Sequence, residues 1–218
     1  YNINDNYWRT LGFEKGIPNG RIFDLFSNNS HLWIGSNKGL SRIEQSTLNL
    51  DPIGIEKIFR NYSVYDIEYI ESKFWFGTSV GLFIYSDKQS QLMRISDIGR
   101  KNFVDNVFNV ISIKYYDNSV YAVSDAGIIK FDLNEEEWDL FYSSSIYNND
   151  QVLSMAINKK FIFLGLENRL IKIDKITGFI KEYKFSFLGR INDIIIDGKE
   201  VWLGSSSGLI KFLWKRHL

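Results

Sequence analysis

Aspartates recur at one position of short apolar segments, where carboxylates are uncommon. Asp24, Asp66 and Asp193 are each the third residue of such a segment, and Ser112 and Ser154 take that place in two others. If these five segments are arranged around a common central axis, their oxygen-bearing side chains lie at the same depth along it. They could then form a ring around a central channel that holds a cation or ordered waters. We favour the alternative that each one bonds a backbone N–H or hydroxyl of its neighbour, because buried carboxylates in strands are usually paired in this way.

Polar residues next to these segments form a second candidate set. They lie in loops of unequal length that also carry aromatic residues, and variable polar loops on a rigid scaffold are common binding sites. Aromatic rings beside Arg, Asn and Gln can stack on a sugar or bury a side chain of a partner protein. We predict that these residues rim the mouth of a channel and bind a protein partner or an oligosaccharide. The predicted ligand-binding residues are Arg21, Asn37, Lys38, Arg60, Asn109, Tyr147, Gln151 and Arg190.

Catalytic chemistry has little support in the sequence. The two histidines, His31 and His217, have no partner at a recognisable spacing, and we expect both to be solvated turn and tail residues. There is no nucleophile elbow, phosphate-binding loop or metal-ligand cluster, and the absence of cysteine excludes disulfides and thiolate sites. We therefore predict no catalytic residue, no metal and no cofactor.

A fivefold repeat must position all of these residues. The stretch Leu32–Leu40 recurs with the aromatic anchors Trp33, Trp75, Tyr121, Phe163 and Trp202, which are 39 to 46 residues apart. Each segment that carries an aspartate or serine begins 11 residues before its anchor, so the hairpin between the two has a constant length. A period near 40 residues with several short strands is typical of β-propeller blades.

Each repeat is predicted to be one four-stranded antiparallel blade. Glycines supply the turn after the anchor strand in four copies; the fourth copy has Arg169, and there we expect Asn168 to take the left-handed conformation. The hydroxyls of Ser36, Thr78 and Ser205 are expected to satisfy backbone groups between blades, and Trp33 and Trp75 are expected to be buried there.

The fifth repeat ends after its third strand, and an isolated strand at residues 7–10 precedes the first repeat. The simplest solution is that this strand completes the fifth blade, which leaves no unpaired edge. The sequence therefore predicts an all-β, five-bladed β-propeller that is one domain over residues 1–218, with its last blade closed by the N-terminal strand. The alternative is a slice of a longer propeller.

Composition narrows the class of function. The 26 Lys and Arg residues balance the 26 Asp and Glu residues, so we expect no nucleic-acid partner, since such proteins carry a basic excess. No apolar run is long enough to span a membrane, and we expect no direct membrane insertion. The lack of cysteine suits a bacterial periplasm or cell surface, although many cytosolic proteins also lack it.

The repeat resembles a known family. Gly16-Ile17-Pro18-Asn19-Gly20-Arg21-Ile22, followed by Leu32-Trp33-Ile34-Gly35-Ser36 and Gly39-Leu40, is similar to the two-component regulator propeller repeat. The resemblance covers about residues 7–212 and is weaker in the third and fourth copies, which have Val123 and Arg169 in place of glycine. It implies a periplasmic sensing propeller that recognises carbohydrates or other envelope signals. Together with the lack of cysteine, it predicts a location in the bacterial periplasm or at the cell surface.

We carry three hypotheses from the sequence. The leading one is a non-catalytic recognition or sensing propeller of the bacterial cell envelope that binds a glycan or a protein at the channel mouth. The second is a structural or assembly subunit of a larger envelope complex. The third is a propeller lyase or hydrolase, which would require a carboxylate–histidine or metal cluster in a funnel at the mouth.

Overall fold

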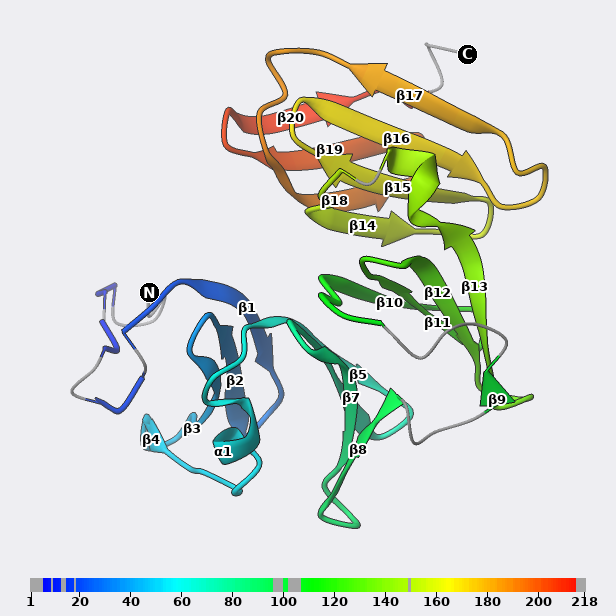
Figure 1. Ribbon diagram of the computed structural model, residues 1–218. Helices are drawn as coiled ribbons and strands as arrows, with labels where there is room; N and C mark the ends of the chain where they lie inside the picture. Colours follow the sequence, from blue (N-terminus) through cyan, green and yellow to red (C-terminus); the bar gives the residue numbers. More distant parts are fainter. Residues whose placement is uncertain are drawn as a thin grey trace. The chain divides into compact units, whose positions relative to one another are not determined.

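The computed structural model describes residues 6–8, 10–12, 15–17, 19–95, 100–101, 107–148 and 150–214. It is built almost entirely of β-strands (Figure 1), as the recurrent short apolar segments predict. The chain divides into two compact units, residues 1–67 and residues 68–218, which are described separately. The predicted single domain over the whole chain stays a prediction.

The first unit contains one complete antiparallel sheet and one short helix. The sheet has the strand order β1-β2-β3-β4, and it places Trp33 opposite Arg42 in the neighbouring strand. The buried face of this sheet packs Ile34 and Ile43 against Ile17. The elements are β1 (Ile22–Ser27), β2 (His31–Ser36), β3 (Gly39–Glu44), β4 (Asn49–Leu50) and α1 (Glu56–Phe59).

Four further sheets follow along the chain. Three of them contain an antiparallel run of four consecutive strands, and the last has three strands among the described residues. Their strands are β5 (Val64–Ile70), β6 (Lys73–Thr78), β7 (Gly81–Ser86) and β8 (Gln91–Arg94); β10 (Ser112–Tyr116), β11 (Ser119–Val123), β12 (Gly127–Asp132) and β13 (Glu137–Ser143); β14 (Ser154–Ile157), β15 (Phe161–Leu166), β16 (Arg169–Asp174) and β17 (Ile180–Lys184); β18 (Ile191–Asp197), β19 (Glu200–Ser205) and β20 (Gly208–Phe212).

This architecture confirms the predicted all-β, five-bladed β-propeller fold of antiparallel blades. The predicted completion of the fifth blade by residues 7–10 falls partly on Arg9, which lies outside the described residues, so it stays a prediction. The sequence did not predict β9 (Arg100–Lys101), which pairs in parallel with β13. An outer strand such as β13 offers unpaired backbone groups that favour such an addition.

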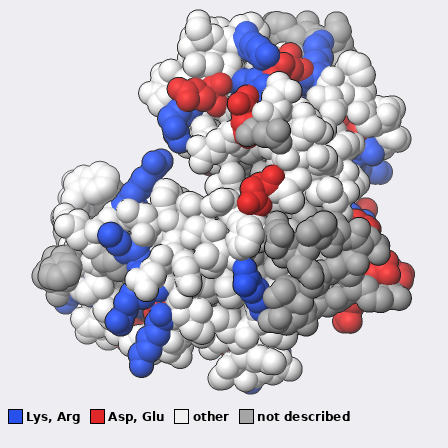
Figure 2. All heavy atoms as spheres, viewed as in Figure 1, with Lys and Arg blue, Asp and Glu red and all other residues white. Residues whose placement is uncertain are grey.

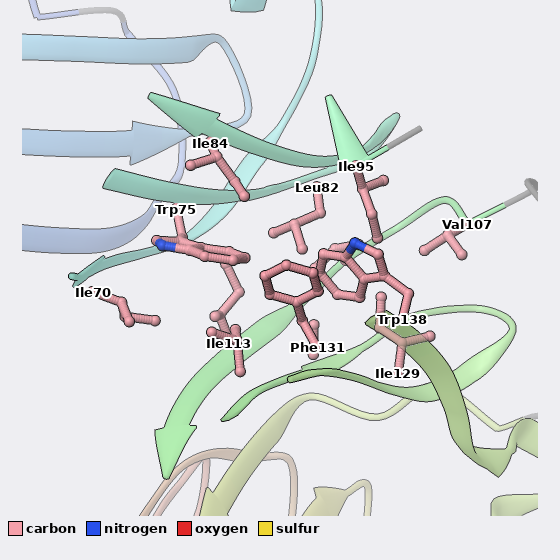
Figure 3. Close-up of a cluster of buried hydrophobic side chains, with 13 residues drawn as sticks. Ile70, Trp75, Leu82, Ile84, Ile95, Val107, Ile113, Ile129, Phe131 and Trp138 are labelled. Atoms are coloured by element: carbon pink, nitrogen blue, oxygen red, sulfur yellow. The ribbon is translucent and has the colours of Figure 1, made fainter. Parts of the chain in front are cut away.

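The aromatic anchors are core residues, as predicted for Trp33 and Trp75. These two side chains are 1% and 2% exposed. In the second unit, Trp75 packs on Phe131 and Trp138 of the following blade, with ring centroids 6.0 and 6.3 Å apart (Figure 3). The anchor of the fifth blade, Trp202, is only half-buried, and Lys211 Nζ lies 5.3 Å from the centroid of its ring. Trp75 is thus buried by the blade that comes next.

The glycines two residues after Trp33 and Trp75 are explained by the approach of the following blade. A Cβ atom on Gly35 would lie 2.8 Å from Val64 O, and one on Gly77 would lie 2.5 Å from Val110 O. Both carbonyls belong to the innermost segment of the following blade, whose backbone therefore passes closer than a side chain would allow. The repeated Trp-x-Gly pattern is accordingly a packing device.

The hydroxyls that follow these glycines bond backbone groups, but not where we expected. The Ser36 Oγ donates to Gly39 O at 3.0 Å and accepts from Lys38 N at 3.1 Å, and Thr78 makes the equivalent pair of bonds. These partners lie in the turn of the same blade, so the prediction of bonds between blades was wrong. The reason is local: a hydroxyl at the end of a strand is already within reach of the two-residue turn that follows it.

Candidate functional site

The residues of the predicted channel ring mainly bond backbone groups. Asp24 Oδ2 accepts a hydrogen bond from Ile67 N at 2.8 Å, and Ser154 Oγ donates to Ile191 O at 2.8 Å. Asp193 Oδ1 accepts from Ile194 N at 2.8 Å. Asp24 and Ser154 thus bond backbone groups of the following blade, whereas Asp193 bonds the next residue of its own strand. Asp66, Ser112 and Ser154 are buried, Asp24 is half-buried and Asp193 is exposed. The described residues contain no group of three or more His, Asp or Glu side chains that could hold a metal ion.

His31 corrects one sequence-based expectation, because it is not a free turn residue. Its Nε2 lies 2.9 Å from Asp51 Oδ2, and the same oxygen accepts a 2.6 Å bond from Arg42 Nη2. The spacing concealed this pair because β3 lies between β2, which carries His31, and β4, which precedes Asp51. His217 lies outside the described residues.

Arg21 and Asn37, two of the predicted mouth residues in the first unit, are hydrogen-bonded to each other. Asn37 Oδ1 accepts from Arg21 N at 2.9 Å, while Asn37 N donates to Arg21 O at 3.0 Å. The Arg21 guanidinium lies 5.3 Å from the centroid of the Phe23 ring. The backbone of Arg21 is therefore fastened to the turn after β2, and its side chain is partly engaged.

The other two, Lys38 and Arg60, line a pocket of about 440 Å³ that lies entirely within the first unit. We call it the basic pocket. At the left of Figure 2, several Lys and Arg side chains stand on the visible face of this unit, with few Asp or Glu atoms among them. The basic pocket is lined by Gly16, Lys38, Leu40, Ser41, Arg42, Leu50, Pro52, Gly54, Glu56, Lys57 and Arg60.

The predicted mouth residues of the second unit have different environments. Asn109 is exposed and has a left-handed backbone, with φ of 47°. Tyr147 is only 3% exposed, and its hydroxyl donates to Ser124 O at 3.0 Å. Burial, and then the charge of Asp125, raises the pKa of Tyr147 well above its ordinary value, so the phenol stays neutral. Its side chain has the position of a core residue.

Gln151 and Arg190 line one pocket of about 300 Å³, which we call the Arg190 pocket. Arg190 immediately precedes β18, and Glu167 forms an antiparallel β-bridge with it. Among the described residues, no ion pair or hydrogen bond engages the half-buried Arg190 guanidinium, whereas its backbone N is held by Ser206 Oγ at 2.9 Å. The Arg190 pocket is lined by Asp150, Gln151, Leu153, Leu166, Glu167, Arg169 and Arg190.

An ion-pair network that the sequence did not reveal supports this pocket. The buried Arg169 guanidinium donates to Asp150 Oδ2 at 2.6 Å, to Glu182 Oε1 at 2.7 Å and to Tyr147 O at 2.9 Å. In the sequence, Arg169 differs from the other repeats only in replacing their glycine. The preceding Asn168 takes the left-handed conformation, with φ of 55°, which confirms its predicted role in the turn. The replacement thus brought an arginine into the wall of a pocket.

The network predicts a pH dependence of stability. Burial by itself raises the pKa of Glu182, but hydrogen bonds from Lys184 and Arg169, and the charges of both, lower it below its ordinary value. A carboxyl whose pKa is lower in the folded chain stabilises the fold above the unfolded-state pKa, and this is lost as the pH falls through the folded-state pKa. We expect Glu182→Gln to destabilise the protein by less than about 1 kcal/mol at pH 7, since the side chain is 34% exposed.

Urea unfolding of the wild type and Glu182→Gln at three pH values tests this. The difference between them should be present at about pH 7 and should disappear between about pH 5 and pH 3. Glu135→Gln, a change of an exposed glutamate at a hairpin turn, is the control and should show little difference at any pH. A difference for Glu182→Gln that is equal at all three pH values would contradict the assignment.

Comparisons with known proteins place this geometry in context. No protein family model matches the chain. No curated protein sequence matches it either. Among solved structures, the extracellular domain of BT3049, a candidate hybrid two component system of B. thetaiotaomicron, has a TM-score of 0.70 and 17% identity over 94% of this chain and 30% of that one. The corresponding domain of BT4673 from the same organism has a TM-score of 0.68 and 20% identity over 88% of this chain and 26% of that one.

A third similar structure is PorZ, a surface component of the type-IX secretion system of Porphyromonas gingivalis, with a TM-score of 0.55 and 12% identity over 88% of this chain and 24% of that one. The chain spans between about a quarter and a third of the length of these three proteins. At such identities, the similarity establishes the fold. The chain therefore has the fold of a segment of the extracellular domains of bacterial one- and two-component systems.

Proposed function

We propose that the chain is a non-catalytic recognition propeller of the bacterial cell envelope that binds a polar ligand in the Arg190 pocket. The observation that carries the proposal is the juxtaposition of Gln151 and Arg190 in one pocket, from segments 39 residues apart in the sequence. Both precede an innermost strand of a blade. A pocket of about 300 Å³ is at the lower end of the range for small-molecule sites.

The chemistry of the pocket suits a neutral, hydroxyl-rich ligand. Arg190 offers a guanidinium that is not committed to an ion pair with a described residue, Gln151 offers an exposed amide, and Glu167 offers an exposed carboxylate. These groups donate and accept hydrogen bonds, while Leu153 and Leu166 supply an apolar surface. An oligosaccharide presents both hydroxyls and an apolar ring face, so we favour a glycan over a protein partner at this pocket.

The structural comparisons support the proposed sensing role and envelope location. Two of the similar structures are extracellular domains of regulatory systems, and the repeat resembles the two-component regulator propeller family. We therefore place the chain in the periplasm or at the cell surface, as a sensing module that needs no cofactor and has no catalytic residue. No helix in the described part of the chain has the length and apolarity needed to cross a membrane.

A second candidate function is an assembly subunit of an envelope complex. The similarity to PorZ, a component of a secretion system, favours it. The exposed side chains of Phe179, Phe187 and Leu209, which are 61–72% exposed, would suit contact with another protein. The enzyme hypothesis has less support, because the only histidine described, His31, is bonded to Asp51 and does not line the Arg190 pocket.

The experiment is a titration of the ¹⁵N-labelled protein with neutral disaccharides, namely cellobiose, mannobiose and chitobiose, followed by NMR. We expect saturable shifts of the amides of Gln151, Glu167 and Arg190 with at least one sugar. Arg190→Ala should weaken that binding at least tenfold while the melting temperature changes little, since the side chain has no structural partner among the described residues. Lys199→Ala, at the opposite end of the same blade, is the matched control.

Two results would reject the proposal. If none of the three sugars shifts these amides, the Arg190 pocket is not a glycan site. If Arg190→Ala unfolds the protein, Arg190 is a structural residue, and the side chain cannot be held ready for a ligand.

A further inference from the structure

The basic pocket of the first unit carries positive charge that the described residues do not neutralise. Lys38, Lys57 and Arg60 are exposed, and none of the three is in an ion pair within the described part of the chain. Arg42 differs, because its Nη2 bonds Asp51 Oδ2 at 2.6 Å. The one carboxylate that lines the pocket, Glu56, accepts hydrogen bonds from the backbone nitrogens of residues 53 and 54, at 3.0 and 2.8 Å. Three uncommitted cations therefore face one partly satisfied anion.

The fold holds these cations together in spite of their mutual repulsion. Lys38 lies in the turn between β2 and β3, and Arg60 directly follows α1. Gly39 permits the approach of the two segments, because a Cβ atom there would lie 2.6 Å from Phe59 O and 3.3 Å from Arg60 Cα. Phe59 is fully buried and anchors the helix to the blade. Because the backbone fixes the positions, an anion that enters the pocket gains from both charges without having to gather them.

Part of the lining of the basic pocket is apolar. Leu40 is buried, whereas Leu50 is 41% exposed and lines the same pocket as Pro52. The volume of about 440 Å³ is many times that of a single inorganic ion and falls in the range of small-molecule sites. A ligand that fills it must combine a negative group with an organic body.

We propose that the basic pocket binds an organic oxyanion, a carboxylate, sulfate or phosphate carried on a body of about the size of one or two sugar rings. Arg60 presents a planar donor pair that matches such an oxygen pair, and Lys38 and Lys57 add point charges. Leu50 and Pro52 contact the apolar face of the body. This site shares no residue with the Arg190 pocket, and its ligand class differs in charge, so neither assignment depends on the other.

The local concentration of charge argues against an extended polyanion as the ligand. The whole chain has 26 basic and 26 acidic residues, so it lacks the general basic excess that attracts nucleic acid. Lys38, Lys57 and Arg60 all line one pocket. That arrangement fits a small anion.

The test is a set of NMR titrations with glucuronate, glucose 6-sulfate and glucose 6-phosphate, with glucose as the neutral counterpart. At least one anion should produce saturable shifts at the amides of Gly54, Lys57 and Arg60, with an affinity at least tenfold above that of glucose. The affinity should fall as NaCl is raised from 50 to 500 mM, because salt screens the attraction. The ranking of the three anions identifies which oxyanion the pocket prefers.

The double variant Lys57→Gln/Arg60→Gln should weaken the binding at least tenfold and leave the melting temperature nearly unchanged, since both side chains are exposed. Lys88→Gln/Lys159→Gln removes the same total charge at hairpin tips of other blades, and we expect it to bind as the wild type does. The Arg190→Ala variant should also bind normally, which separates this site from the Arg190 pocket.

Three outcomes would overturn the inference. In the first, none of the three anions shifts these amides. In the second, glucose binds as tightly as its charged derivatives, so that charge does not matter. In the third, the Lys57→Gln/Arg60→Gln variant binds no more weakly than Lys88→Gln/Lys159→Gln, and the attraction comes only from the overall charge.

Discussion

Replacement of Trp75 with alanine is expected to lower the free energy of unfolding by about 3–5 kcal/mol. The Trp75 side chain is 2% exposed and contacts Phe131 and Trp138 of the following blade (Figure 3). Its Nε1 has no hydrogen-bond partner among the described residues, so the loss comes from packing and from the cavity that remains. Urea denaturation followed by circular dichroism measures it.

The control for this prediction is Phe179→Ala. The Phe179 side chain is 62% exposed, so its removal should change the stability by no more than about 0.5 kcal/mol. If Trp75→Ala costs less than about 1 kcal/mol, the anchor aromatics are not the core of the blades, and the packing described here is wrong.

Replacement of Gly77 with alanine is expected to destabilise the protein by about 1–3 kcal/mol, although only one methyl group is added. The new Cβ atom would lie 2.5 Å from Val110 O and 3.2 Å from Val110 Cγ1. Since the first of these is backbone, the innermost segment of the following blade would have to move. Urea denaturation measures this loss. It does not come from backbone strain at Gly77, because the φ angle of Gly77 is outside the left-handed region.

Gly204→Ala is the matched control, because Gly204 holds the same repeat position in the fifth blade. There a Cβ atom would lie 3.6 Å from Asp193 Cβ and 3.9 Å from Asp193 O, which are ordinary van der Waals contacts. We expect a change within about 0.5 kcal/mol. Equal losses for Gly77→Ala and Gly204→Ala would show that the glycine is required by its own blade and not by the approach of the next one.

The sequence by itself determined the type of fold and much of its detail. A constant offset of 11 residues between two strands of every repeat allows only one hairpin length, and a period near 40 residues leaves room for about four strands. The burial of Trp33 and Trp75 and the left-handed Asn168 were predictable for the same reason. These features depend on local geometry, and the same local sequence pattern occurs in all five repeats.

The tertiary structure alone decided which side chains meet. His31 and Asp51 are 20 residues apart and Arg169 and Asp150 are 19 residues apart, and no motif signals either pair. The eight predicted ligand-binding residues were one set in the sequence, but Lys38 and Arg60 line one pocket and Gln151 and Arg190 another, while Tyr147 is buried. Such outcomes depend on the close approach of different strands and turns. The repeated positions determine the strands of each blade. The contacts between loops depend instead on side-chain size and charge at positions where the repeats differ.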